Sequence, residues 1–199
     1  MAWSISKRIN SQEYRPRIFD KNKSSKKDNE RLREILSLKK SSNNDKISAA
    51  VISRKTGSWW RQIILNKGSK DGVEIGSTVI GPGGLLGIVN KTSFFTSSVT
   101  LLTSPQSKVG VWVDRNQING LLVGLGNDYP SLILYSKDAD IKVGDFVSSS
   151  PASTLLPPNI PIGVIQSVDE PFKSKKTAKI SLLAKPHVID WVQIIRKSI

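Results

Sequence analysis

The 199-residue chain has no cysteine and only one histidine, His187. The absence of cysteine excludes a disulfide framework, a thiolate metal site and a cysteine nucleophile, and one histidine cannot build a histidine cluster for a metal. No apolar run approaches the ~18 residues that a membrane-spanning helix needs, and residues 1–19 lack the apolar core of a signal peptide. We therefore expect the chain alone to be soluble, and we expect no metal or cofactor.

The single histidine also argues against hydrolytic chemistry. The serine-rich run 148–150 faintly resembles the nucleophile loop of double-barrel serine proteases, but in that class the histidine precedes the serine. Here no histidine precedes Ser148. The run GPGGLLG (81–87) lacks the lysine and the following helix of a phosphate-binding loop. We therefore expect no catalytic residue and no enzyme activity, with a protease-like barrel as the least favoured alternative.

Positive charge is what the chain has in excess, with a formal net charge of +14. Residues 1–50 hold 13 Lys or Arg and 6 Asp or Glu, so half of the excess lies in the first quarter of the chain. Such a segment is attracted to nucleic acid or to anionic membranes, although charge runs are usually only solvated. A basic small-barrel nucleic-acid-binding protein is therefore the alternative function. Against it, the cations of residues 51–199 are scattered and the aromatics fall within apolar segments.

The N-terminal region divides into two parts. Residues 1–27 are rich in Ser, Asn, Lys and Arg, a composition that predicts a disordered basic segment. Residues 28–40 predict a helix with Leu32, Ile35 and Leu36 on one face. Because a helix of ~12 residues is marginal alone, we expect this face to pack against a partner helix or against the rest of the protein.

From residue 47 onward the pattern is that of strands. Short segments rich in Val, Ile, Thr and Trp alternate with Gly, Pro, Asn and Asp, and no helix-length periodicity interrupts them. Four elements also recur in the same order in both halves. They are IILNKGSKDGVEIGSTV (63–79) and LILYSKDADIKVGDFV (132–147), GIV (87–89) and GVI (163–165), VTLLTSP (99–105) and ISLLAKP (180–186), and Trp-Val at 112–113 and 191–192.

The repeat predicts an all-β fold of two tandem small β-barrel modules, covering residues 47–113 and 118–199. The last strand of the second module is also a candidate to complete the first barrel. Gly76 and Gly144 occupy matching positions after polar turns, where a positive φ is expected.

Two aromatic pairs, Trp59–Trp60 and Phe94–Phe95, are candidate partner-binding residues. Neighbouring residues on a strand point to opposite faces, and a small barrel has one packed interior. Each pair should therefore leave one ring outside unless another element covers it. An exposed aromatic ring is a typical anchor of a protein interface, so the pattern favours a scaffold that acts by binding proteins.

These motifs resemble the family of the bacterial rod shape-determining protein MreC. The resemblance covers about residues 29–199 and rests on an ordered set of motifs. The set is NERLREIL, AAVISR, SWW, LNKGSKDGV, GSTVIGPGGLLGIV, SSVTLLT, GLLVGLG, KVGDFVSSS and LPPNIPIGVI. No single motif is decisive, whereas the ordered set is specific.

The resemblance implies a scaffold on the periplasmic face of the bacterial inner membrane, with two β-barrel domains after a coiled-coil helix. Helix 28–40 would then be the end of that coiled coil. Its implied partners are the elongation transpeptidase with its polymerase, MreB and MreD, and the family tends to form homodimers. The family's N-terminal membrane anchor is missing from this sequence, so membrane contact is expected only through a missing anchor or the basic segment. Nucleic acid is not an expected partner.

Overall fold

The structure is a computed structural model that describes residues 46–55, 61–136, 139–169 and 175–196. The predicted disordered segment 1–27 and the predicted helix 28–40, with its Leu32, Ile35 and Leu36 face, lie outside the described residues. Within the described ranges, no helix is long and apolar enough to cross a membrane.

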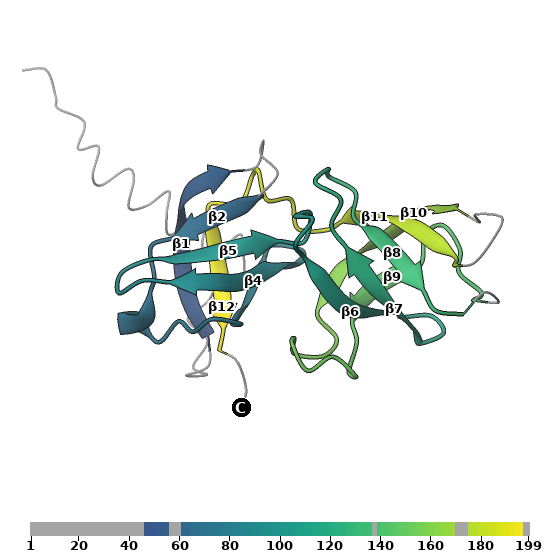
Figure 1. The fold of residues 1–199 in the computed structure, drawn as a ribbon, viewed down its shortest axis with the longest axis horizontal. Helices are drawn as coiled ribbons and strands as arrows, with labels where there is room; N and C mark the ends of the chain where they lie inside the picture. The colour runs from purple at the N-terminus through teal and green to yellow at the C-terminus, as the bar shows by residue number, and fades with distance from the viewer. Residues whose placement is uncertain (1–45, 56–60, 137–138, 170–174, 197–199) are drawn as a thin grey trace, which may run out of the picture. The chain divides into compact units, whose positions relative to one another are not determined.

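The described residues form twelve β-strands and a short 3₁₀ helix, η1 (Figure 1). Their bounds are β1 Lys46–Lys55, β2 Gln62–Leu65, η1 Ser69–Asp71, β3 Thr78–Gly81, β4 Gly84–Thr92, β5 Ser97–Leu101, β6 Lys108–Val113, β7 Ile118–Val123, β8 Ser131–Leu134, β9 Phe146–Ser149, β10 Pro161–Asp169, β11 Thr177–Leu182 and β12 Trp191–Ile195.

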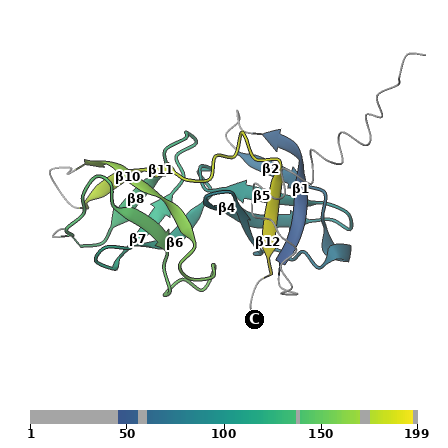
Figure 2. The same ribbon diagram turned by 180° about the vertical axis from the view of Figure 1, so that it is seen from behind.

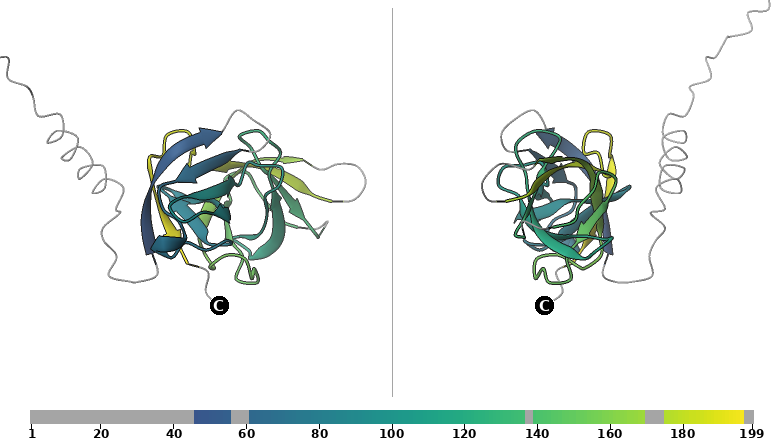
Figure 3. Two further views of the ribbon diagram at one scale, coloured as in Figure 1. Left: turned by 60° about the vertical axis from the view of Figure 1, so that its left-hand side comes forward. Right: turned by 90° about the vertical axis from the view of Figure 1, so that its right-hand side faces the viewer.

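The strands close into two six-stranded barrels, which confirms the predicted all-β double-barrel fold. The first barrel has the strand order β1-β12-β3-β4-β5-β2, and the second has the order β10-β11-β8-β7-β6-β9. Figure 2 shows β12 beside β1, and the views in Figure 3 show the strands curving round into closed rings. Every pairing in both barrels is antiparallel.

The two barrels have the same topology. Matching β1 to β7, β2 to β8, β3 to β9, β4 to β10, β5 to β11 and β12 to β6 turns one strand order into the other. If β1–β6 and β7–β12 are taken as two repeats, their sixth strands have changed places. The second barrel is consequently continuous in sequence, while the first is completed by the last strand of the chain.

The predicted boundary between the modules therefore needs a correction. Residues 47–113 were expected to form the first module, but β6 (Lys108–Val113) belongs to the second barrel and β12 closes the first. The sequence pattern does not distinguish the two strands. β6 ends with a Trp-Val pair and β12 begins with one, and in both strands the Trp is half-buried. Pairing with neighbouring strands, and not local sequence, decides which barrel accepts each one.

Gly76 and Gly144 show how closely the repeats agree. Their φ angles are 91° and 95°, in the region where glycine is favoured. The Gly76 amide donates to the Val89 carbonyl at 2.8 Å, and the Gly144 amide donates to the Ile165 carbonyl at 2.9 Å. Gly76 thus lies in the turn that leads into β3 and is hydrogen-bonded to β4, and Gly144 lies in the turn that leads into β9 and is hydrogen-bonded to β10. Both have the positive φ that their matching positions in the repeat predict.

Each barrel has its own apolar core, built by the two-residue alternation of its strands. In β5, for example, Val99 and Leu101 are buried while Ser98 and Thr100 are only half-buried. The second core also includes Leu85 and Leu102, which come from β4 and from the connection after β5. Apolar side chains of the first-barrel sequence therefore help to fill the second core.

Candidate partner-binding surface

Phe94 and Phe95 lie at the tip of the hairpin that joins β4 to β5. On a strand, as predicted from the sequence, one ring would lie outside. The two residues instead occupy the connection, and both rings are exposed, at 62% and 60%. The reason is that strand alternation does not apply to a turn. The two rings contact each other edge to face, with centroids 4.8 Å apart and planes at 85°.

The hairpin tip is fixed by the segment around η1. The Ser69 amide donates to the Ser93 carbonyl at 2.9 Å, and the Lys70 amide donates to the Phe94 carbonyl at 3.2 Å. Within the tip, the Ser93 amide donates to the Thr96 carbonyl at 2.8 Å. The two phenylalanines are therefore presented on a backbone that is held at several points, which lowers the entropy lost when a partner binds.

Two lysines give the tip a polar border. Lys70 Nζ lies 4.2 Å from the centroid of the Phe95 ring, a cation–π contact. Lys67 pairs with Asp71 at 2.7 Å, and this hydrogen bond holds the pKa of the Asp71 carboxyl below its usual value. An aromatic centre with a charged rim is the usual anatomy of a protein interface. We refer to Phe94, Phe95 and Lys70 as the hairpin-tip surface.

The other predicted binding pair, Trp59 and Trp60, lies outside the described residues. Sequence reasoning also missed several exposed apolar side chains of the second barrel, among them Tyr135 at 67%, Val143 at 66% and Phe146 at 56%. Val143 directly precedes Gly144 and matches Ile75, which precedes Gly76 and is 60% exposed. The internal repeat itself could have identified this second pair of positions.

A charged clamp orders the loop before β9 in the second barrel. Arg115 contacts Asp145 at 2.9 Å and Asp140 at 2.8 Å, and it also donates to the Asp140 carbonyl oxygen. These hydrogen bonds lower the pKa of both carboxyls and raise that of the guanidinium. The Asp145 side chain is only 9% exposed, so this half of the clamp is the better shielded.

The serines considered for catalysis are occupied by other contacts. Ser148 Oγ donates to Asp114 at 3.0 Å, Ser149 Oγ donates to the Pro157 carbonyl at 2.6 Å, and Ser150 Oγ donates to Asn119 at 2.7 Å. Each bond lies within the sequence that forms the second barrel. Among the described residues, no group of three or more His, Asp or Glu side chains is arranged to hold a metal ion.

The fold defines a class of protein, that of two tandem closed six-stranded antiparallel β-barrels. The barrel core of rod shape-determining protein MreC matches residues 51–196. This chain belongs to the MreC family. The cell shape-determining protein MreC of Haemophilus influenzae is 33% identical over 144 residues, which are 72% of this chain and 41% of that relative. The chain thus spans less than half of that protein's length.

Solved structures agree with this assignment. A structure described as MreC has a TM-score of 0.75 and 27% identity, covering 86% of this chain and 99% of its own. One described as the major periplasmic domain of the cell shape-determining filament MreC has a TM-score of 0.68 and 26% identity, covering 77% and 96%. The complex between penicillin-binding protein PBP2 and MreC from Helicobacter pylori shares the fold, with a TM-score of 0.61, 15% identity, and coverage of 77% and 98%.

Proposed function

We propose that this chain is a scaffold that organises the peptidoglycan elongation machinery by binding its proteins. The observation that carries the proposal is the hairpin-tip surface, where Phe94 and Phe95 expose about three fifths of their area. Aromatic side chains on a fixed backbone are the side chains that most often dominate binding energy. Membership of a family of cell shape-determining proteins supports the same conclusion.

The partners proposed are the elongation transpeptidase with its polymerase, MreB and MreD, together with a second copy of the chain. The Helicobacter pylori complex of PBP2 with MreC supports the first of these by likeness of fold. The proposed location is the periplasmic face of the inner membrane, in keeping with the periplasmic domain of the related structure. The predicted helix face of Leu32, Ile35 and Leu36 would serve the homodimer, and Trp59 and Trp60 would extend the partner-binding set.

The proposed mechanism is positional. A closed antiparallel barrel has no free strand edge and deforms little, so it holds its surface loops in a constant arrangement. A partner bound at the hairpin tip is then held at a set position relative to other bound proteins. The scaffold would activate such a partner only if it bound one of the partner's conformations more tightly than the other.

The test is a binding titration of the whole chain with the cognate transpeptidase. Phe94→Ala and Phe95→Ala should each weaken binding by about 30-fold, as expected when an anchor worth ~2 kcal/mol is truncated, and the double variant should weaken it further. Phe146→Ala is the matched control, because Phe146 is 56% exposed but lies on β9 of the second barrel. Unchanged affinity in the double variant would contradict the role given to the hairpin tip.

The nucleic-acid alternative is tested in parallel. DNA binding measured across a range of salt concentrations should be weak and should not change in the hairpin-tip variants. Tight binding with a steep dependence on salt would instead favour the alternative, because such a slope reports ions released from phosphates by Lys and Arg.

A further inference from the structure

The outer wall of the second barrel carries apolar side chains on neighbouring strands. Outward positions alternate with buried ones along β6, β7, β8 and β11. The strand pairings arrange these outward positions in rows that run across the wall. One row is Lys108, Val123, Ser131 and Lys179, the next is Gly110, Leu121, Ile133 and Thr177, and a third begins with Trp112 and Asn119.

Tyr135 continues the third row. It directly follows β8, shares the outward parity of Ile133, and is 67% exposed. Leu121 and Ile133, which lie directly opposite each other, are half-buried and therefore level with the wall. On the β6 side the wall ends at Gly110, which Ser153 covers. We refer to Leu121, Val123, Ile133 and Tyr135 as the barrel-wall surface.

The first barrel differs at the position of the tyrosine. Tyr135 matches Asn66 in the internal repeat. Asn66 Oδ1 accepts a hydrogen bond from the Ala50 amide at 2.8 Å, so this side chain serves the pairing of its own barrel. The first barrel thus closes without an aromatic residue at this place, and the fold does not require the exposed ring of Tyr135.

Cations outnumber carboxylates around the barrel-wall surface. Lys108 and Lys179 stand at the two ends of one row, and neither has an ion-pair partner among the described residues. Lys175 is exposed and lies two residues before β11. The carboxylate that borders the surface is Asp169, opposite Thr177 on β10. The border therefore has three positive charges and one negative charge.

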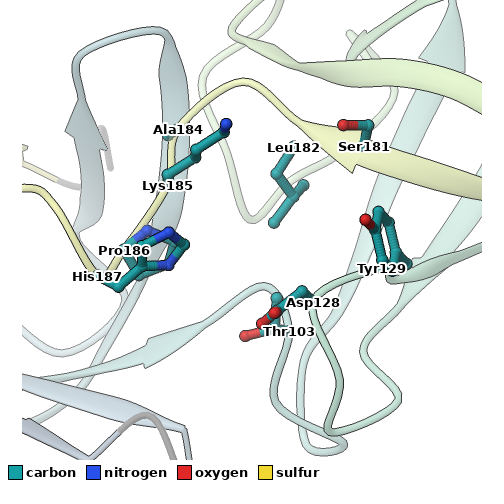
Figure 4. A pocket seen from close by; sticks show the side chains of 9 residues that line it. All are labelled: Thr103, Asp128, Tyr129, Ser181, Leu182, Ala184, Lys185, Pro186 and His187. Atoms are coloured by element: carbon teal, nitrogen blue, oxygen red, sulfur yellow. The ribbon is translucent and has the colours of Figure 1, made fainter.

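The cleft drawn in Figure 4 provides a contrast. It measures about 200 Å³, and Asp128 and Lys185 both line it. Its charges are opposite and balance, so the cleft indicates no charged partner. The excess of one sign is a property of the barrel-wall surface.

A flat apolar centre with a lysine border fits an acidic protein best. Nucleic acid would place phosphates against Leu121 and Ile133, which offer them nothing. A membrane contact requires apolar side chains that project into the lipid, whereas these two are level with the wall. A second copy of the chain, with its net charge of +14, would add positive charge to the lysines.

We propose that the barrel-wall surface binds an acidic protein. Tyr135 is the anchor of the contact, because an exposed tyrosine buries a large area and loses little conformational entropy. Carboxylates of the partner lie near Lys108 and Lys179 and guide its approach. This surface belongs to the second barrel and is separate from the hairpin-tip surface, so the scaffold has one binding surface on each barrel.

The first experiment is photo-cross-linking in cells from Tyr135→p-benzoylphenylalanine in the whole chain. We expect one protein of negative net charge to be cross-linked, and we expect it to differ from the chain itself. The same photoreactive residue at Phe146, which is 56% exposed on β9, is the control and should not capture that protein.

The second experiment is titration of the whole chain with the captured protein after its purification. Tyr135→Ala should weaken binding about tenfold or more. The double variant Lys108→Glu with Lys179→Glu should weaken it about tenfold at low salt and remove most of its dependence on salt. Lys55→Glu with Lys91→Glu makes the same change of charge at exposed residues of the first barrel, and this control should bind like the parent.

Several results would overturn the proposal. They are no cross-link from Tyr135, a cross-link only to a second copy, a captured protein of positive net charge, or binding that Tyr135→Ala leaves unchanged. Binding of the chain to phosphatidylglycerol vesicles that Tyr135→Ala abolishes would assign the surface to a membrane instead. These variants share no residue with the hairpin-tip titration, so a failure here is distinguishable from a failure there.

Discussion

Trp112 and Trp191 occupy matching places in the two sequence repeats, yet each lies in the barrel formed mainly by the other repeat. Trp112 is on β6, which pairs with β7 and β9, and Trp191 is on β12, which pairs with β1 and β3. The first barrel therefore needs the far end of the chain in order to close.

Deleting β12 should open the first barrel and leave the second nearly intact. The deletion removes Val192 and Ile194, which are fully buried in the first core, and leaves the facing edges of β1 and β3 unpaired. Residue-resolved hydrogen exchange should show lost protection in β1–β5 and retained protection in β6–β11. Equal loss in both barrels would show that the second depends on the first more than its continuous topology indicates.

Replacing the hairpin-tip rings should scarcely change stability. Phe94 and Phe95 are exposed, so Phe94→Ala and Phe95→Ala should each change the free energy of unfolding by no more than about 0.5 kcal/mol. Leu101→Ala is the contrasting variant, because Leu101 is 1% exposed in the adjoining strand, and it should lose about 2–5 kcal/mol. Urea denaturation measures all three. A large loss in the phenylalanine variants would assign these rings a structural role.

Gly84→Ala should destabilise the protein more than Gly144→Ala. Both glycines have positive φ, but a Cβ on Gly84 would lie 2.1 Å from the Pro161 carbonyl oxygen, whereas one on Gly144 would meet nothing within 4 Å. We expect a loss of about 1–2 kcal/mol from backbone strain alone at Gly144, and a larger loss at Gly84. The two variants are compared by the denaturant concentration at the unfolding midpoint, with the slope of the unfolding free energy against denaturant equal in both. Equal losses of stability in the two variants would mean that β4 and β10 can separate at this contact without a cost in free energy.

The Arg115–Asp145 contact should make stability depend on acid pH. Chiefly through its hydrogen bonds from the side chain, Arg115 lowers the pKa of folded Asp145 below the unfolded value of about 3.9. The stabilisation is therefore complete above the unfolded pKa and disappears as the pH falls through the folded pKa. Asp145→Asn should lower the melting temperature at pH 7, and its difference from the parent should shrink as the pH falls below the unfolded pKa and through the folded one.

A matched control for this pH dependence is Asp190→Asn. Asp190 is paired with Arg54 at 2.6 Å, but its side chain is 70% exposed, and ion pairs of that kind contribute about 0–1 kcal/mol. The control should have nearly the parent's melting temperature at both pH values. If Asp145→Asn showed the same deficit at pH 2 as at pH 7, its effect would come from the lost loop geometry and not from the charge.

The repeated glycines made the fold predictable from the sequence. Gly76 and Gly144 mark the same turn in both repeats because a positive φ restricts the residue type wherever that turn recurs. The sequence offered the last strand as a candidate to complete the first barrel, where β12 does lie, but it did not place β6 in the second barrel. Both strands have the same local character, and only tertiary pairing separates them.

The candidate sites were less predictable than the fold. Phe94 and Phe95 were identified by residue type, although the reason given for their exposure was wrong because the pair lies in a turn. Arg115 meets Asp145 across 30 positions of the sequence. That arrangement leaves no local pattern that periodicity or spacing could have detected.

The pairing of β1 with β12 also determines how the protein would respond to mechanical tension. Lys46 at the start of β1 lies opposite Ile195 at the end of β12, so the two ends of the described chain leave from the same end of one ladder. A pull that separates them would load the hydrogen bonds of this ladder one after another, like a zipper, and not all together. The second barrel lies outside that path until β12 has detached. Tension would therefore open the first barrel at low force, while the second barrel kept its structure and whatever it binds.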